Sequence, residues 1–179
     1  RHGILRDAIP RDYAVRYKAG SAAPSRAGLR SSRPLRSWRT CRSSRPRGEV
    51  AAFMFDPRND TLWTTGVVEC RPLSAGPLIT GSRVERVTKF LGKKMTYLVE
   101  VTAHGEEQFV EMRVKEPFPM HIRYELADHR GGTLARIRCQ GEGAGFFRIA
   151  GPLLSRMVRR SITNDLENLK ECLEGRAAA

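Results

Sequence analysis

Motifs for metal binding and catalysis are absent from this sequence. Its four cysteines, Cys41, Cys70, Cys139 and Cys172, are widely separated and form no CxxC pair, and its four histidines form no HExxH or similar spacing. There is also no phosphate-binding glycine loop and no Ser-His-Asp order. We therefore expect no structural zinc, no other metal and no cofactor, and we expect reduced cysteines in a cytoplasmic protein.

Long apolar runs are missing as well, so the sequence contains neither a transmembrane segment nor the apolar region of an export signal. Acidic residues are scarce near the N-terminus. Residues 1–47 contain 13 of the 32 lysines and arginines but only two of the 19 acidic residues, which gives a net charge of +11. The remaining residues carry only +2. Because the excess charge lies outside the apolar body, we expect no specific nucleic-acid-binding domain.

Residues 1–44 are predicted to form a basic, largely disordered extension, because Arg, Ser, Ala, Gly and Pro dominate its second half and large apolar residues are few. Weak contact with an anionic surface and an organelle transit peptide are alternative roles for this segment. The first methionine is Met54, so the sequence leaves the true N-terminus open. The last residues, 176–179, are expected to form a short disordered tail.

Alternating apolar residues predict six strands after two short helical turns. In residues 94–102, for example, Met95, Tyr97 and Val99 alternate with polar or exposed positions, which is typical of a sheet with one buried face. The helical turns are expected at residues 49–55 and 60–63. The strands are expected at residues 66–73, 83–91, 94–102, 107–115, 120–126 and 133–140.

A long amphipathic helix is predicted at residues 151–173, with Pro152 in its first turn. Its apolar stripe consists of Leu154, Met157, Val158, Ile162, Leu166, Leu169 and Leu173. Strands followed by one long helix indicate an α+β domain in which a curved antiparallel sheet grips the helix.

Several segments resemble the polyketide cyclase/dehydrase-like proteins of the START and birch-pollen-allergen-like superfamily, called SRPBCC. The segments are RPRGEVAAFMFDPRND, Trp63, GSRVERVTKFLGKKMTYLVEVT, GGT at 131–133 and DLENLKECLE, and the resemblance covers about residues 45–175. It implies a helix-grip fold: a seven-stranded antiparallel sheet wrapped round the C-terminal helix, with a deep lipophilic cavity between them.

The first strand of that fold is poorly marked in this sequence. It should precede Arg45-Pro46, but the stretch PLRSWRTCRSS has only Leu35, Trp38 and Cys41 at a spacing of three. Three alternatives remain: a poor strand forms there, residues 13–17 replace it, or the sheet lacks an edge strand.

Fifteen residues are predicted to line the cavity, from strand alternation, from the inner helix face and from the resemblance. They are Trp63, Val84, Arg86, Phe90, Met95, Tyr97, Val99, Met112, Ile122, Tyr124, Leu154, Met157, Ser161, Ile162 and Asp165. Alternation alone favours a solid core built from the same apolar residues, whereas the resemblance favours a cavity.

Ser161 and Asp165 lie one helical turn apart within the apolar arc of the last helix. A buried carboxylate there needs a partner, and Arg86 or Tyr124 are candidates. The alternative, which we prefer from sequence, is that the stripe drifts and Asp165 lies solvated at its edge.

The predicted function is binding of a small hydrophobic ligand of the lipid, polyketide or isoprenoid type, by a monomer or homodimer. The alternative is a polyketide cyclase, dehydrase or aromatase that uses the same cavity, with Tyr97, Tyr124 and Arg86 as polar groups. No catalytic residue is assigned. A third alternative is a module whose basic N-terminal segment binds nucleic acid or anionic lipid.

Overall fold

The computed structural model describes residues 36–90, 92–117, 119–141 and 146–175. Its elements are β1 (Arg36–Ser43), α1 (Arg47–Met54), the 3-10 turn η1 (Pro57–Asn59), α2 (Asp60–Trp63), β2 (Val67–Pro72), β3 (Arg83–Phe90), β4 (Lys93–Gly105), β5 (Phe109–Val114), β6 (Met120–His129), β7 (Gly132–Gly141) and α3 (Phe146–Gly175). The six predicted strands, the two short helical segments and the long last helix are confirmed.

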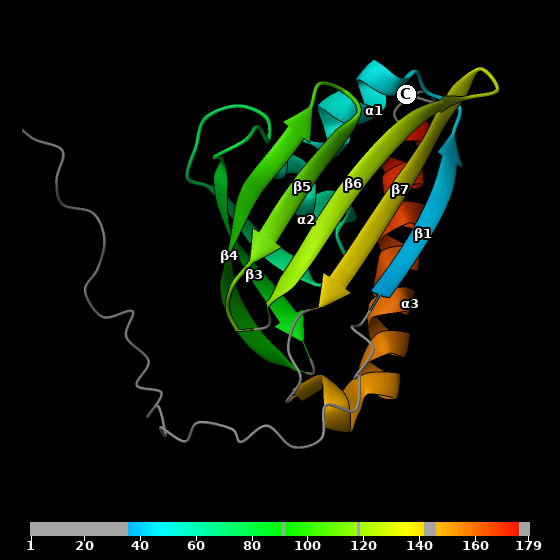
Figure 1. Cartoon of the computed structure of the whole chain (residues 1–179). Helices are drawn as coiled ribbons and strands as arrows, with labels where there is room; N and C mark the ends of the chain where they lie inside the picture. Colours follow the sequence, from blue (N-terminus) through cyan, green and yellow to red (C-terminus); the bar gives the residue numbers. More distant parts are fainter. Residues whose placement is uncertain (1–35, 91, 118, 142–145, 176–179) are drawn as a thin grey trace, which may run out of the picture. The chain divides into compact units, whose positions relative to one another are not determined.

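All seven strands form one antiparallel sheet with the order β1-β7-β6-β5-β4-β3-β2. From β2 to β7 each strand pairs with the next along the chain, and β1 closes the far edge by pairing with β7. The sheet curls round α3, whose C-terminal part lies near α1 (Figure 1). This is the helix-grip fold that the sequence predicts.

The weakly marked first strand forms where the first alternative placed it. Arg36–Ser43 pairs with β7 from Arg36 opposite Gln140 to Ser43 opposite Thr133, so it belongs to the sheet although we had assigned it to the extension. An edge strand needs backbone pairing more than large apolar side chains, and its buried inner positions are small, Ser37 and Ser43. The alternative strand at 13–17 and the rest of 1–35 lie outside the described residues.

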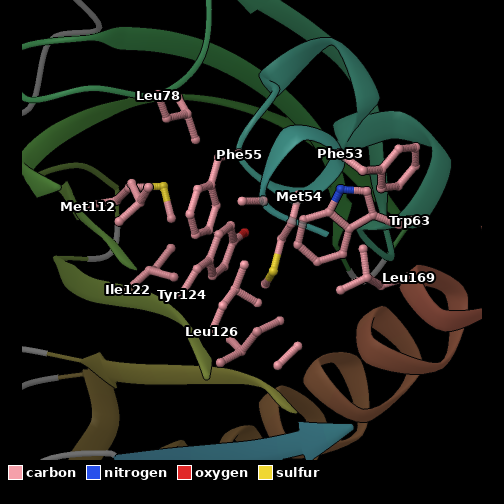
Figure 2. Close-up of a cluster of buried hydrophobic side chains, with 14 of the residues drawn as sticks. Phe53, Met54, Phe55, Trp63, Leu78, Met112, Ile122, Tyr124, Leu126 and Leu169 are labelled. Carbon is pink, nitrogen blue, oxygen red and sulfur yellow. The ribbon is translucent and has the colours of Figure 1, made fainter. Parts of the chain in front are cut away.

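One end of the sheet's inner face is a packed core under α1, α2 and the C-terminal half of α3. The Trp63 ring meets the Tyr124 ring edge to face, with centroids 5.4 Å apart, and its side chain is fully buried. Met54, Leu126 and Leu169 are drawn beside them in Figure 2 and are buried as well. Each such side chain contributes about 1.5–3 kcal/mol relative to exposure, so this end fixes the sheet on the helices.

Candidate functional site

A cavity of about 380 Å³ lies between the other end of the inner face and the middle turns of α3, from Met157 to Asp165. Its size is within the range of small-molecule sites, which is roughly 300–1,000 Å³. Apolar side chains from β4 to β7 and from α3 make most of its wall, including Met95, Val114, Met120, Ile122 and Met157. A few polar groups interrupt this wall, as in sites that orient a ligand.

Nine of the fifteen predicted lining residues lie on this cavity. They are Arg86, Met95, Tyr97, Ile122, Tyr124, Met157, Ser161, Ile162 and Asp165. Two others, Phe90 and Leu154, belong to β3 and α3, but their side chains lie outside the described part of the structure.

The remaining four, Trp63, Val84, Val99 and Met112, are buried in the packed core and do not line the cavity. Alternation identifies the face of the sheet on which a residue lies, but not the end of the strand that α1 and α2 cover. The sequence also missed Val67, Val114, Met120 and Ile137, which do line it. Val114 and Met120 alternate in phase with the predicted Met112 and Ile122, whereas no residue of β7 was predicted to line the cavity.

A buried ion pair lies where the cavity meets the packed core. Arg86 is 2% exposed and Asp60 0%, and the Arg86 Nε and Nη2 atoms lie 2.8 and 2.7 Å from Asp60 Oδ2. The Cys70 thiol donates to the same oxygen at 3.1 Å. Burial disfavours the charged guanidinium, but the Asp60 carboxylate together with Tyr124, Tyr97 and Cys70 outweighs it and raises the pKa of Arg86, which is therefore a cation on the cavity wall.

Sequence reasoning did not identify Asp60 as the partner of Arg86. Its place at the start of the short helix α2, just before the buried Trp63, was the available signal, because a charged Arg in phase with Val84 on an inner face requires a carboxylate. The pairing joins positions 26 residues apart and so depends on the tertiary fold.

Asp165 is buried, at 7% exposure, so the preferred sequence interpretation of a solvated edge position was wrong. Its Oδ1 accepts a hydrogen bond from the backbone N–H of Thr65 at 2.6 Å, while Arg86 pairs with Asp60 instead. Burial raises the pKa of Asp165 to about 6, against the opposing effects of the Thr65 hydrogen bond and the Arg86 charge.

Two tyrosines and one cysteine are further polar residues of the wall. Burial raises the pKa values of Tyr97 and Tyr124, although the positive charge of Arg86 opposes this, so both phenols stay protonated at neutral pH. Burial also raises the pKa of Cys139 to about 12, which leaves its thiol unreactive. Among its polar groups the wall thus offers the buried Arg86 cation, two neutral phenols and one carboxyl group with a pKa near neutrality, besides the exposed Lys89 and the hydroxyls of Ser161 and three threonines.

Metal-binding clusters of three or more His, Cys, Asp or Glu do not occur among the described residues. The four cysteines are free. Of the helices in the described ranges, none is long and apolar enough to cross a membrane.

No protein-family model and no curated protein sequence matches this chain. Solved structures do. TTHA0849 from Thermus thermophilus has a TM-score of 0.68 and 15% identity over 79% of this chain and 98% of its own. A START superfamily protein from Mycobacterium smegmatis has a TM-score of 0.66 and 13% identity over 78% and 97%. Ara h 8.0201 has a TM-score of 0.61 and 10% identity over 78% and 97%.

These similarities span nearly the full length of each neighbour at low identity. The chain therefore has the helix-grip fold of the START and birch-pollen-allergen-like proteins, and the resemblance seen in the sequence is confirmed at the level of the fold. A shared fold does not carry a ligand or an activity from one protein to another.

Proposed function

We propose that this chain binds a small hydrophobic molecule, of the lipid, polyketide or isoprenoid type, in the cavity between the sheet and α3. The supporting observation is the cavity itself, about 380 Å³ in volume with mainly apolar walls. An apolar cavity of this size reduces stability, because the atoms around it lack contact partners. A hydrophobic ligand supplies those contacts.

The polar groups on the wall define which end of such a ligand they meet. Arg86 is a buried cation beside Tyr97 and Tyr124, so this part of the wall favours an acceptor oxygen, such as a carbonyl, hydroxyl or carboxylate. A pure hydrocarbon would leave the guanidinium without further hydrogen-bond partners. The proposed ligand is therefore apolar with one oxygen-bearing end.

Native mass spectrometry of the full chain purified from cells tests the proposal. We expect a discrete additional mass that is released by denaturing extraction and then identified. The Met120→Trp variant should lose this mass, because Met120 lies on the cavity wall and an indole occupies part of the space. Leu134→Trp is the matched control, since Leu134 lies on the outer face of β7 and does not line the cavity. An equal loss in both variants, or no additional mass under any lipid supplementation, contradicts the proposal.

A second candidate function is catalysis on the bound molecule by a polyketide cyclase or dehydrase type of reaction. The observation that favours it is the placement of Asp165, a buried carboxyl group with a pKa of about 6, on the same wall as Tyr97 and Arg86. The extraction experiment separates the two functions. A supplied ligand recovered unchanged indicates binding, whereas a changed mass that depends on Asp165 indicates catalysis.

A further inference from the structure

A second hollow lies on the opposite face of α3 from the cavity and is lined almost entirely by arginine. Arg39 of β1 and Arg156, Arg159, Arg160 and Thr163 of α3 form a groove of about 450 Å³, which we call the arginine groove. On α3 these residues recur three and four positions apart, so they share one side of the helix. Arg39 reaches them because β1 lies against α3, as Figure 1 shows.

The four guanidinium groups of the arginine groove have no carboxylate partner within the described ranges. The only hydrogen bond that one of them makes there is from Arg39 Nη1 to the Trp38 carbonyl oxygen at 2.8 Å. Several other surface arginines are paired, such as Arg47 with Asp128 at 2.8 Å and Arg71 with Glu69 at 2.8 Å. Four arginines without a carboxylate partner in the described ranges therefore meet in this groove.

Four neighbouring cations repel each other, and an anion removes that repulsion. The planar guanidinium forks match the geometry of phosphate oxygens, to which each can donate two hydrogen bonds. No acidic residue occurs in α3 between Phe146 and Asn164, so the helix supplies no competing negative charge there. The chemistry of the groove is that of a phosphate-binding surface.

The position of the groove indicates which kind of molecule carries the phosphate group. The same turns of α3 that present Arg156, Arg159 and Arg160 to the groove present Met157 and Ile162 to the cavity. A surface bound at the groove is thus one helix away from the proposed ligand site.

We propose that the arginine groove docks the chain on the phosphate headgroups of an anionic lipid bilayer. The bilayer itself is then the source of the hydrophobic ligand, and this part of the proposal rests on the function proposed above. Docking itself requires only Arg39, Arg156, Arg159 and Arg160. It is independent of whether the cavity is occupied.

Sedimentation of the full chain with vesicles tests the docking site. We expect binding to phosphatidylcholine vesicles that contain phosphatidylglycerol and little binding to phosphatidylcholine alone. Each basic residue near an anionic surface strengthens binding by roughly fivefold. The triple variant Arg156→Gln, Arg159→Gln, Arg160→Gln should therefore bind about 100-fold more weakly. Glutamine keeps the helix propensity at these exposed positions.

The control removes the same charge elsewhere and keeps residues 1–47, with their net charge of +11, intact. The triple variant Arg58→Gln, Arg71→Gln, Lys115→Gln changes three exposed residues that already have carboxylate partners. We expect it to lose much less affinity. Equal losses in the two triple variants overturn the proposal, since binding would then follow net charge alone.

Two further arms distinguish other sources of phosphate. If millimolar glycerol phosphate releases the chain from the vesicles as effectively as an excess of unlabelled vesicles does, the groove binds a soluble phosphate ligand. That result would overturn the proposal of bilayer docking. Groove-dependent binding to an RNA oligonucleotide without binding to vesicles would overturn it as well. Native mass spectrometry reports separately on the cavity. A wild-type chain that docks on vesicles but carries no bound mass contradicts only the proposed function, and a groove variant that keeps the bound mass shows that the cavity is intact.

Discussion

The inner face of the sheet has two halves that share one sequence pattern but are filled differently. In the packed half, Trp63, Val99 and Met112 are fully or almost fully buried against α1, α2 and the C-terminal part of α3. In the cavity half, Met95 and Met157 are only partly buried and border about 380 Å³ of space. The apolar alternation of the strands continues through both halves.

The difference lies in what covers the sheet. Two additional short helices cover the packed half, whereas among the described helices α3 alone covers the cavity half. Larger side chains at a few wall positions would close the space and stabilise the fold. A sequence that keeps methionine, valine and buried polar groups at these positions retains an open site at a cost in stability. This supports a ligand as the reason for the open half.

The largest expected effect comes from separating the ion pair that joins the two halves. Arg86 lines the cavity, while its partner Asp60 begins α2 in the packed half. Arg86→Met leaves the Asp60 carboxylate buried without its cation, so we expect the free energy of unfolding to fall by about 3–5 kcal/mol. Urea unfolding measures this change.

The double variant Asp60→Leu, Arg86→Met is the control, because it removes both charges and should recover most of the lost stability. A single variant that loses less than about 1 kcal/mol contradicts the view that this pair is desolvated. An equally large loss in the double variant would mean that the shape of the two side chains, rather than their charge, determines stability.

The second prediction concerns Asp165, the buried carboxyl group of the cavity half. Its pKa rises from 3.8 to about 6 on folding, so the folded state holds a proton that the unfolded state releases between these values. Stability therefore falls as the pH rises from about 4 to about 6, by at most about 3 kcal/mol. Asp165→Asn lacks this titration and keeps an oxygen that can accept from Thr65.

We expect Asp165→Asn to match the wild type near pH 4 and to be more stable at pH 7.5, by urea unfolding at both values. Asp56→Asn is the control with the opposite sign. A hydrogen bond from Arg58 lowers the pKa of Asp56, so the ionised Asp56 carboxylate stabilises the folded state. Asp56→Asn should therefore lower stability at pH values above the pKa of Asp56 and not below it. If the wild type is more stable than Asp165→Asn at pH 7.5, the result contradicts the burial of Asp165 that we describe.

The sheet and the last helix were predictable because their signals are local and periodic. The alternation in β4 and the apolar stripe of α3 each specify a buried face without knowledge of the partner. β1 was harder, because an edge strand that buries only small side chains on its inner face has no apolar period. Its place is set by pairing with β7 and by Gly132, whose missing side chain allows the close approach of the Ser43 backbone.

The candidate site was predictable only in part. Periodicity identified nine lining residues, because they point to the inner face. It identified neither the partner of Arg86 nor the burial of Asp165. Both depend on how α2 and the loop at Thr65 cover the sheet. The distinction between core and cavity likewise depends on the covering helices, which no pattern within a single strand records.

The smallest expected effect tests the boundary between the two halves at one pair of residues. Val99 of β4 and Val114 of β5 are directly opposite in the sheet and almost fully buried, but only Val114 lines the cavity. One additional methylene at Val99 has no space, so Val99→Ile should lose about 1–3 kcal/mol of unfolding free energy. The methylene added by Val114→Ile enters the cavity and should stabilise by up to about 0.8 kcal/mol.

Thermal and urea unfolding of both variants measure this contrast, and native mass spectrometry reports whether Val114→Ile weakens retention of the bound mass. Since the substitution is the same and the residues are sheet neighbours, strand propensity and side-chain entropy cancel between them. Equal destabilisation would mean that side chains fill the space next to Val114, and the open half would then be a second packed core. Opposite signs would place the boundary of the cavity between two adjacent strands.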